Sequence, residues 1–377
     1  MTRRRRVHGL RRLECFARFA AGCVLGMLGL AVLGSAGVLA GSASAQTVSV
    51  QTVSAQTVSA QTDDGPIEPV RLASEIFGGP LEIEVRDLPR QRAEAAIRAA
   101  ILEAFEISLL ADPDGERPEG LGALNRAAGG PAVALDPRIA ELLLRAQQYC
   151  VWSENAHGPL GGRIYALWQD GTPDPRELRA AIDTATCDKL LLETDETPRA
   201  RLADGARADV RGMRRGFAVD RAMAVLREHG ARNAVIEVES LVRAIGAGLE
   251  DRGWPVAIPG VEGTRHPLDQ VWLHDQSLAL SRADSYAERP IDLRDGVPSR
   301  GVVQVAAVSE LAMDVEALAT TLYVLGLPSG KRLLGRLSPR PSVLWLLGTA
   351  QGTPLESTYL WSNLDRERTP RRPRRSY

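Results

Sequence analysis

Helix-like and strand-like apolar patterns both occur along the chain, but they do not alternate regularly as in a fold of repeated βαβ units. This irregular order constrains the fold class more than any other feature of the sequence. Some segments repeat apolar side chains at helical spacing, as at Ile97, Ile101 and Phe105. Other segments are short runs rich in β-branched residues, typical of strands, at residues 81–85, 234–238, 302–308 and 342–347. We therefore predict an α+β fold of mixed sheets and packed helices.

Two of the helices carry boundary signals. Asp136 and Pro137 suit the N-cap and first-turn positions of a helix, and an apolar stripe follows them at Ile139, Leu142, Leu143 and Ala146. A second stripe lies at Ala218, Ala222, Val225 and Leu226. Gly230 suits the end of that second helix, because glycine accepts the left-handed backbone that often terminates helices.

The first 45 residues have the order of a secretory signal. Residues 1–12 are basic, residues 21–40 are apolar, and an A-x-A sequence ends at Ala45. We therefore expect a signal peptide over residues 1–45 and a protein exported to the periplasm or to the outer face of the inner membrane. The apolar run is long enough to leave an uncleaved membrane anchor open.

The rest of the chain divides by composition. Residues 46–66 contain a five-residue repeat of small and polar side chains, which predicts a low-complexity linker. Residues 366–377 form a basic, proline-broken tail. The folded domain is expected over residues 67–365, and membrane association would come only from an uncleaved signal or from weak attraction of the tail to anionic lipid.

Charge and cysteine content narrow the function classes. With 46 Lys+Arg against 47 Asp+Glu, the net charge of −1 argues against a general nucleic-acid-binding protein. Removal of the signal leaves Cys150 and Cys187, which could form a disulfide in an oxidising compartment. The sequence leaves that pairing open.

Six segments between about Phe77 and Leu347 are similar, in order and spacing, to motifs of the FAD:protein FMN transferases, the ApbE family. They are FGGPLEIEV (77–85), LGALNRAAGGPAVALDPRIAELLLRA (121–146), NAHGPLGGRIYALW (155–168), DVRGMRRGFAVDRAMAVLREHGARNAVIEVESLVRAIG (209–246), IDLRDGVP (291–298) and VEALATTLYVLG (315–326). The resemblance implies that family's fold, with a cofactor cleft between lobes. It also implies that Mg²⁺ assists the transfer of FMN from FAD to a Thr or Ser of a partner flavoprotein.

The resemblance also implies where FAD would bind. Phe77 stands in the place of the family's M-G-T segment, and Asp209 matches an Asp that touches FAD. Ala156, His157 and Gly158 occupy the place of A-F-D, so His157 and Gly158 replace two residues that contact the flavin. A lone histidine in a loop is most often solvated, and no catalytic residue is assigned.

The turn from Asp209 to Asp220 departs from the family pattern by gaining arginines. Arg211, Arg214 and Arg215 replace a glycine, a small residue and a lysine. Near a helix N-terminus, these guanidinium groups could bind the diphosphate of FAD with favourable charge and geometry. The same side chains could instead fill the space that FAD needs, or form a solvated basic turn.

The family's metal ligands correspond to Gly212, Glu316 and Thr320. Gly212 would offer its carbonyl oxygen, and Thr320 lies one helical turn after Glu316. Glu316 replaces the shorter Asp of the family, which weakens the expected Mg²⁺ site because Mg²⁺ demands near-ideal octahedral geometry. Asp292 and Arg294 are retained and are expected to form an ion pair.

Two functional classes therefore remain open. The first is a divergent FAD:protein FMN transferase with FAD as substrate, a flavoprotein acceptor and a weakened Mg²⁺ site. The second is a catalytically degenerate relative that binds a partner protein or an anionic ligand.

Overall fold

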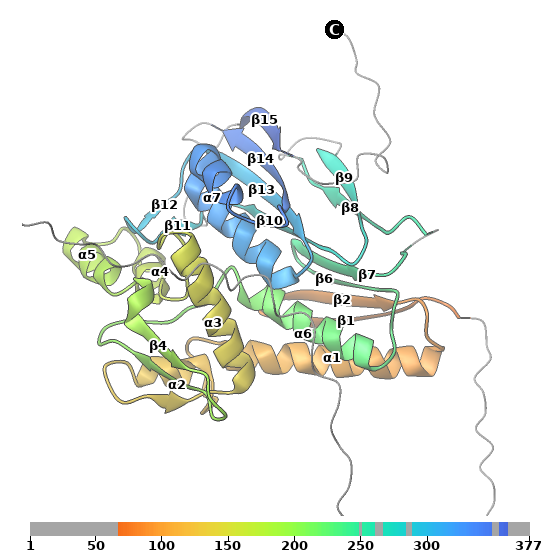
Figure 1. The fold of residues 1–377 in the computed structure, drawn as a ribbon, viewed down its shortest axis with the longest axis horizontal. Helices are drawn as coiled ribbons and strands as arrows, with labels where there is room; N and C mark the ends of the chain where they lie inside the picture. Colours follow the sequence, from red (N-terminus) through yellow and green to blue (C-terminus); the bar gives the residue numbers. More distant parts are fainter. Residues whose placement is uncertain (1–66, 249–250, 261–266, 284–288, 349–353, 361–377) are drawn as a thin grey trace, which may run out of the picture. The chain divides into compact units, whose positions relative to one another are not determined.

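The computed structural model describes residues 67–248, 251–260, 267–283 and 289–348, and the backbone of 354–360 (Figure 1). Its main sheet has eight strands in the order β1-β2-β6-β7-β10-β13-β14-β15, and neighbouring strands pair antiparallel. In chain order the strands are β1 (Val70–Ile76), β2 (Gly79–Val85), β6 (Ala234–Val238), β7 (Leu241–Ile245), β10 (Ser277–Arg282), β13 (Val302–Ser309), β14 (Ser342–Gly348) and β15 (Pro354–Leu360).

Three smaller sheets and the helices complete the described part. The smaller sheets are β3 (Val133–Ala134), β5 (Arg199–Leu202) and β4 (Leu190–Glu193); β8 (Trp254–Ile258) and β9 (Asp269–Leu273); and β11 (Ile291–Asp292) and β12 (Val297–Pro298). The helices are α1 (Arg90–Leu110), α2 (Leu121–Arg126), α3 (Pro137–Trp152), α4 (Gly162–Gln169), α5 (Pro175–Asp183), the 3₁₀ turn η1 (Cys187–Lys189), α6 (Arg214–Glu228) and α7 (Ala312–Leu334). The α+β fold is confirmed.

Both faces of the main sheet contribute to the core, and the two-residue period of the strands divides that core into two clusters. In β14, Val343 and Trp345 belong to the large cluster that includes α1, α6 and α7, whereas Leu344 joins a second cluster. The second cluster contains Trp254 and Leu273 from the β8–β9 hairpin. The helices therefore cover one face of the sheet and the hairpin covers part of the other.

The predicted helix boundaries agree with the structure. The Asp136 side chain accepts a hydrogen bond from the backbone N–H of Arg138, and Pro137 begins α3. Gly230 follows α6 with a φ of +93°. The stripe proposed in α1 is only partly buried: Ile97 is buried, but Phe105 is 46% exposed. Besides Ile97, the buried face consists of Ile107, Leu110 and alanines at positions 93, 96, 100 and 104, and the small alanine side chains let α1 approach α6 closely.

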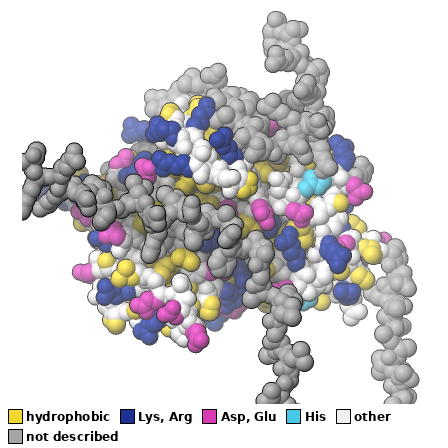
Figure 2. Space-filling view, in the orientation of Figure 1, with side chains coloured by type: hydrophobic (Ala, Val, Ile, Leu, Met, Phe, Trp, Pro, Cys, Tyr) yellow, Lys and Arg dark blue, Asp and Glu magenta, His cyan; other side chains and the backbone are white. Residues whose placement is uncertain are grey.

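Other sequence predictions meet the structure in part. Cys150 and Cys187 form a disulfide with their Cα atoms 5.9 Å apart, which settles the pairing that the sequence left open. The segments 1–45, 46–66 and 366–377 lie outside the described residues. Within the residues that are described, no helix is long and apolar enough to cross a membrane. Figure 2 shows charges of both signs mixed over one face, in keeping with the net charge near zero.

Candidate functional site

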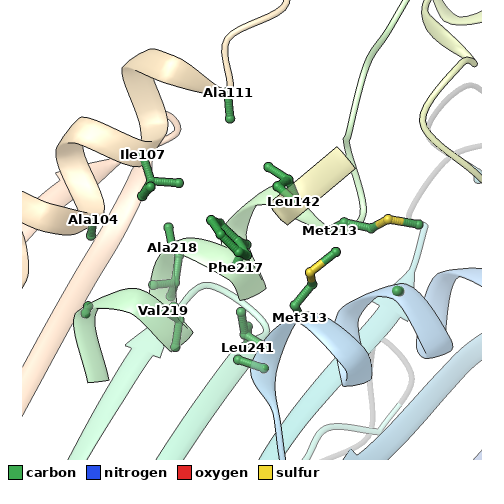
Figure 3. Close-up of a cluster of buried hydrophobic side chains, with 14 of the residues drawn as sticks. Ala104, Ile107, Ala111, Leu142, Met213, Phe217, Ala218, Val219, Leu241 and Met313 are labelled. Carbon is green, nitrogen blue, oxygen red and sulfur yellow. The ribbon is translucent and has the colours of Figure 1, made fainter. Parts of the chain in front are cut away.

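The site is built where α6 and α7 begin, next to each other on the sheet. Asp220 on α6 accepts hydrogen bonds from the backbone N–H groups of Ala312 and Met313, at 2.9 and 3.0 Å, and so satisfies donors at the start of α7. Arg243 on β7 lies 3.2 Å from the Asp220 carboxylate. Figure 3 shows Phe217 of α6 and Met313 of α7 turned into the same buried cluster. The two helix starts are therefore fixed relative to each other.

The turn before α6 is held by Asp209, whose side chain is 5% exposed. One carboxylate oxygen accepts from the backbone N–H of Arg211 at 2.9 Å, and the other accepts from its Nε and Nη2 at 3.0 and 2.7 Å. The Arg211 guanidinium lies over the ring of Tyr165, 4.1 Å from its centroid. Asp209, expected to touch FAD, thus positions Arg211.

Arg214 lies over Phe77, with its guanidinium carbon 5.0 Å from the ring centroid. Phe77 sits in the turn between β1 and β2 with a φ of +55°, a backbone conformation uncommon for an aromatic residue. Two residues assigned to the FAD site from distant segments of the sequence are therefore in contact.

Arg215 bridges two carboxylates. Its Nε donates to Glu316 on α7 at 2.9 Å, and its Nη1 donates to Glu239 in the turn between β6 and β7. The second carboxylate oxygen of Glu316 accepts from the backbone N–H of Gly216 at 2.8 Å. Gly79 leaves room for Glu239, because a Cβ at Gly79 would meet the Glu239 carboxylate.

The other proposed metal ligands lie beside this ion pair. Thr320 donates to the backbone carbonyl of Glu316 at 3.0 Å, one turn earlier in α7. A Cβ built on Gly212 would lie 3.1 Å from the Thr320 hydroxyl and 3.1 Å from Nε2 of His157. The structure therefore places Gly212 beside Thr320, which lies one helical turn after Glu316, and the metal site itself stays a prediction.

His157 is buried, with 1% of its surface exposed, so the expectation of a solvated loop histidine was wrong. Nδ1 lies 3.0 Å from the Thr321 hydroxyl, and Nε2 lies 3.5 Å from the backbone carbonyl of Arg211. Burial lowers the pKa of His157 to about 4, although backbone carbonyls of Arg211 and Ala317 favour the charged form. The imidazole is therefore neutral at pH 7. It joins its loop to α7 and to the segment Asp209–Arg215, called the arginine turn below.

The loop that carries His157 is tied down on both sides. The Ala156 carbonyl accepts from the backbone N–H of Leu293 at 3.1 Å. Gly158 packs on the disulfide, since a Cβ there would lie 2.8 Å from the Cys150 sulfur. The Asn155 side chain accepts from the backbone N–H of Cys187 at 3.0 Å. Ala156 and Gly158 thus serve this loop through their backbones.

The residues present do not fit a divalent cation as they are arranged. Both carboxylate oxygens of Glu316 already accept hydrogen bonds from the chain, one of them from a guanidinium group. Across the described ranges, no three or more His, Cys, Asp or Glu side chains are grouped so that they could hold a metal ion. Mg²⁺ would need Glu316 to exchange its present partners for the metal.

Sequence reasoning missed several residues of the site. Tyr165 and Thr321 lie inside the motifs that carry the resemblance, but nothing in their spacing predicted contacts with Arg211 or His157. Glu239 lies in the turn between two strands, and no sequence pattern there predicted its contact with Arg215. The expected Asp292–Arg294 ion pair is confirmed, at 2.5 Å.

A groove of about 420 Å³ opens beside Glu239. Its apolar wall includes Pro255 and Val256 of β8 and Leu278 and Leu280 of β10, and its polar lining includes Glu237, Ser240 and Arg282. The groove therefore adjoins the acidic partner of Arg215.

Comparisons with known proteins identify the family. The family model described as the ApbE family matches residues 78–345. An FAD:protein FMN transferase of Treponema pallidum is 28% identical over 278 residues, covering 65% of this chain and 76% of that protein. One of Rhodobacter capsulatus is 29% identical over 282 residues, covering 70% of this chain but only 53%, about half, of that longer protein.

Solved structures show the same fold. The ApbE protein of Thermotoga maritima superposes with a TM-score of 0.67 at 21% identity, covering 74% of this chain and 94% of that one. The flavin transferase ApbE of Vibrio cholerae also gives 0.67, at 20% identity, covering 78% of this chain and 97% of that one. With a family match that spans most of the folded region and the motif residues gathered at one site, the chain belongs to the ApbE family.

Proposed function

We propose that this protein is an FAD:protein FMN transferase, which moves FMN from FAD to a Thr or Ser hydroxyl of a partner flavoprotein. Its family membership and the two relatives that bear this name support the proposal. In the reaction, the hydroxyl oxygen forms a bond to the FMN phosphorus while the bond from that phosphorus to the AMP oxygen breaks. AMP leaves with that oxygen, and the proton of the hydroxyl passes to solvent.

The arginine turn is the observation that carries the proposal. Arg211 lies over the ring of Tyr165, three residues before α6 begins, and Arg214, the first residue of α6, lies over the ring of Phe77. Guanidinium groups next to a helix N-terminus suit a diphosphate, because they neutralise charge and donate paired hydrogen bonds. Charge neutralisation and positioning account for most of the catalysis of phosphoryl transfer.

The groove meets the arginine turn only through Glu239, and its wall belongs to the sheet face that carries the β8–β9 hairpin. Its apolar wall suits a ring system of the dinucleotide, while its polar lining suits ribose or base heteroatoms. The carboxylate expected to hold Mg²⁺ is already paired with Arg215, so the arginines are the positive charges that this site offers to a diphosphate.

A binding protein without transferase activity is the second candidate. The Arg215–Glu316 ion pair favours it, because the pair occupies a carboxylate that the expected metal-assisted chemistry would use. Such a relative would bind FAD or another anion and release no AMP.

One experiment separates the two candidates. The purified protein is incubated with FAD, with and without Mg²⁺ and with a Thr- or Ser-bearing acceptor flavoprotein, and AMP and acceptor-bound FMN are measured. Calorimetric titration with FAD is run in parallel. AMP release with FMN attached to the acceptor supports the transferase. FAD binding without AMP supports the binding protein, and absence of both contradicts both.

We propose further that the folded domain works after export. The signal-like order of residues 1–45 and the Cys150–Cys187 disulfide support this, since disulfides persist in oxidising compartments. A fusion of residues 1–62 to a reporter that is active only outside the cytoplasm should give signal. A silent reporter would contradict export.

A further inference from the structure

We infer that the guanidinium of Arg215 stands in for the divalent cation at this site, so that Glu316 and Glu239 are neutralised by the chain itself. The inference rests on the proposed function in one respect only, namely that FAD is the ligand of this site. It concerns a feature of this chain that departs from the Mg²⁺ site its family resemblance implies.

The buried carboxylate of Glu316 is neutralised by groups of the chain itself. Its side chain is 5% exposed, and a buried carboxylate needs a partner of opposite charge or hydrogen-bond donors. Arg215 Nε and the Gly216 N–H supply both at normal hydrogen-bond distances, 2.9 and 2.8 Å. One carboxylate oxygen accepts from the guanidinium and the other from the backbone, so the charge of Glu316 is neutralised without a metal ion.

Glu239 is the second carboxylate that contacts Arg215. Glu239, 40% exposed at its side chain, meets the same guanidinium from the opposite segment of the fold. A divalent cation commonly neutralises a pair of acids in one site. Here one planar guanidinium, 28% exposed, contacts two acids through separate nitrogens, which a lysine ammonium could do only as a point charge.

The positive charge on Arg215 follows from its side-chain chemistry, because an arginine guanidinium is protonated throughout the ordinary pH range.

This arrangement changes what Mg²⁺ can do. To bind beside Thr320 and the Gly212 carbonyl, the ion would have to displace Arg215 from Glu316 and leave a largely buried guanidinium with one acid fewer. Removing the Arg215 charge should free Glu316 and allow the three predicted ligands to bind the ion.

Thermal unfolding of the purified protein with Mg²⁺ or with EDTA tests the inference, because it needs neither FAD nor an acceptor. The parent melting temperature should be the same in both. In Arg215→Met, which keeps the aliphatic stem and removes the charge, Mg²⁺ at about ten times its Kd should raise the melting temperature by roughly 2–4 °C. Arg215→Met with Glu316→Gln should lose that response.

Arg214→Ala is the matched control. It removes a neighbouring arginine whose guanidinium lies over Phe77, whereas Glu316 is held by Arg215, and the variant should stay insensitive to Mg²⁺ like the parent. Stabilisation of the parent by Mg²⁺ that disappears in Glu316→Gln would overturn the inference, as would a folded Arg215→Met variant without a Mg²⁺ response. If Arg215→Met does not fold, the parent and Glu316→Gln comparison still decides.

Failure here and failure of the proposed function can be told apart. A parent that binds Mg²⁺ through Glu316 and releases AMP would keep the transferase and remove the inference. A parent that ignores Mg²⁺ and never releases AMP would keep the inference and remove the transferase.

Discussion

Gly216 on α6 lies directly against Met313 on α7: a Cβ on Gly216 would come within 2.5 Å of the Met313 Cα and 2.4 Å of the Ala312 carbonyl oxygen. Real Cβ atoms do not approach backbone atoms so closely, so only glycine lets the two helix starts pack this tightly. The same contact places the Gly216 N–H on the Glu316 carboxylate at 2.8 Å. Helix packing and the geometry of the candidate site therefore depend on one residue.

Gly216→Ala should destabilise the protein by roughly 2–4 kcal/mol, because the neighbouring atoms are backbone and cannot move aside as a side chain would. Urea unfolding measures the change. Gly335→Ala is the control: it follows α7, and its Cβ would lie 3.3 Å or more from its nearest neighbours. Equal stability of Gly216→Ala and the parent would contradict the close approach.

His157 should make the protein lose stability as the pH falls. The pKa of His157 is lowered from 6.5 to about 4 in the folded chain. Between these values the unfolded chain binds a proton that the folded chain does not, so the free energy of unfolding falls as the pH drops from 6.5 towards 4. The loss is on the order of 3 kcal/mol by linkage.

His157→Phe should flatten that part of the stability curve, because phenylalanine does not titrate and has a similar ring volume. Unfolding in urea at a series of pH values measures the slope for the parent and the variant. His229→Phe is the control, since His229 is exposed. Identical slopes for the parent and His157→Phe would show that His157 is not buried in solution.

The sequence predicted what local patterns determine. Strand 234–238 and the N-cap at Asp136 follow from side-chain period and capping chemistry within a few residues. The shared metal site of Gly212, Glu316 and Thr320 was implied by the family resemblance and stays a prediction. The partners of the arginines could not be predicted in the same way, because Arg215 and Glu316 are 101 residues apart and Arg215 and Glu239 are 24 apart.

Burial was the second thing that the sequence could not show. A histidine in a glycine-containing loop has no periodic pattern around it, so its surroundings depend on α7 and on the arginine turn, which pack over it in the folded chain. The same limit applies to Phe105, where helical spacing was correct but the alanines made the closer-packing face.

Breaking the Cys150–Cys187 disulfide should destabilise the domain and loosen the His157 loop together. The bond closes a separation of 37 residues, and disulfides of this kind contribute roughly 2–4 kcal/mol. Cys187→Ser should therefore lower the free energy of unfolding by about that amount, measured by urea unfolding. A reducing agent should lower it in the parent but not in the variant. Equal midpoints for the reduced and oxidised parent would contradict this.

Arg214→Ala should weaken FAD binding more than it weakens folding. Arg214 lies over Phe77 at the start of α6, where a diphosphate would meet both the guanidinium and the helix N-terminus. Hydrogen bonds to charged groups contribute about 1.5–3 kcal/mol, so calorimetric titration should give an FAD dissociation constant roughly 10–100 times higher. Raising the salt concentration should weaken binding to the parent and have a smaller effect on the variant, because one screened charge pair is already missing.

Arg98→Ala provides the control, since Arg98 on α1 is 66% exposed at its side chain and pairs with Glu94 in the same helix. Its FAD affinity should equal that of the parent. If Arg98→Ala and Arg214→Ala bind FAD equally well, the arginine turn does not hold the diphosphate.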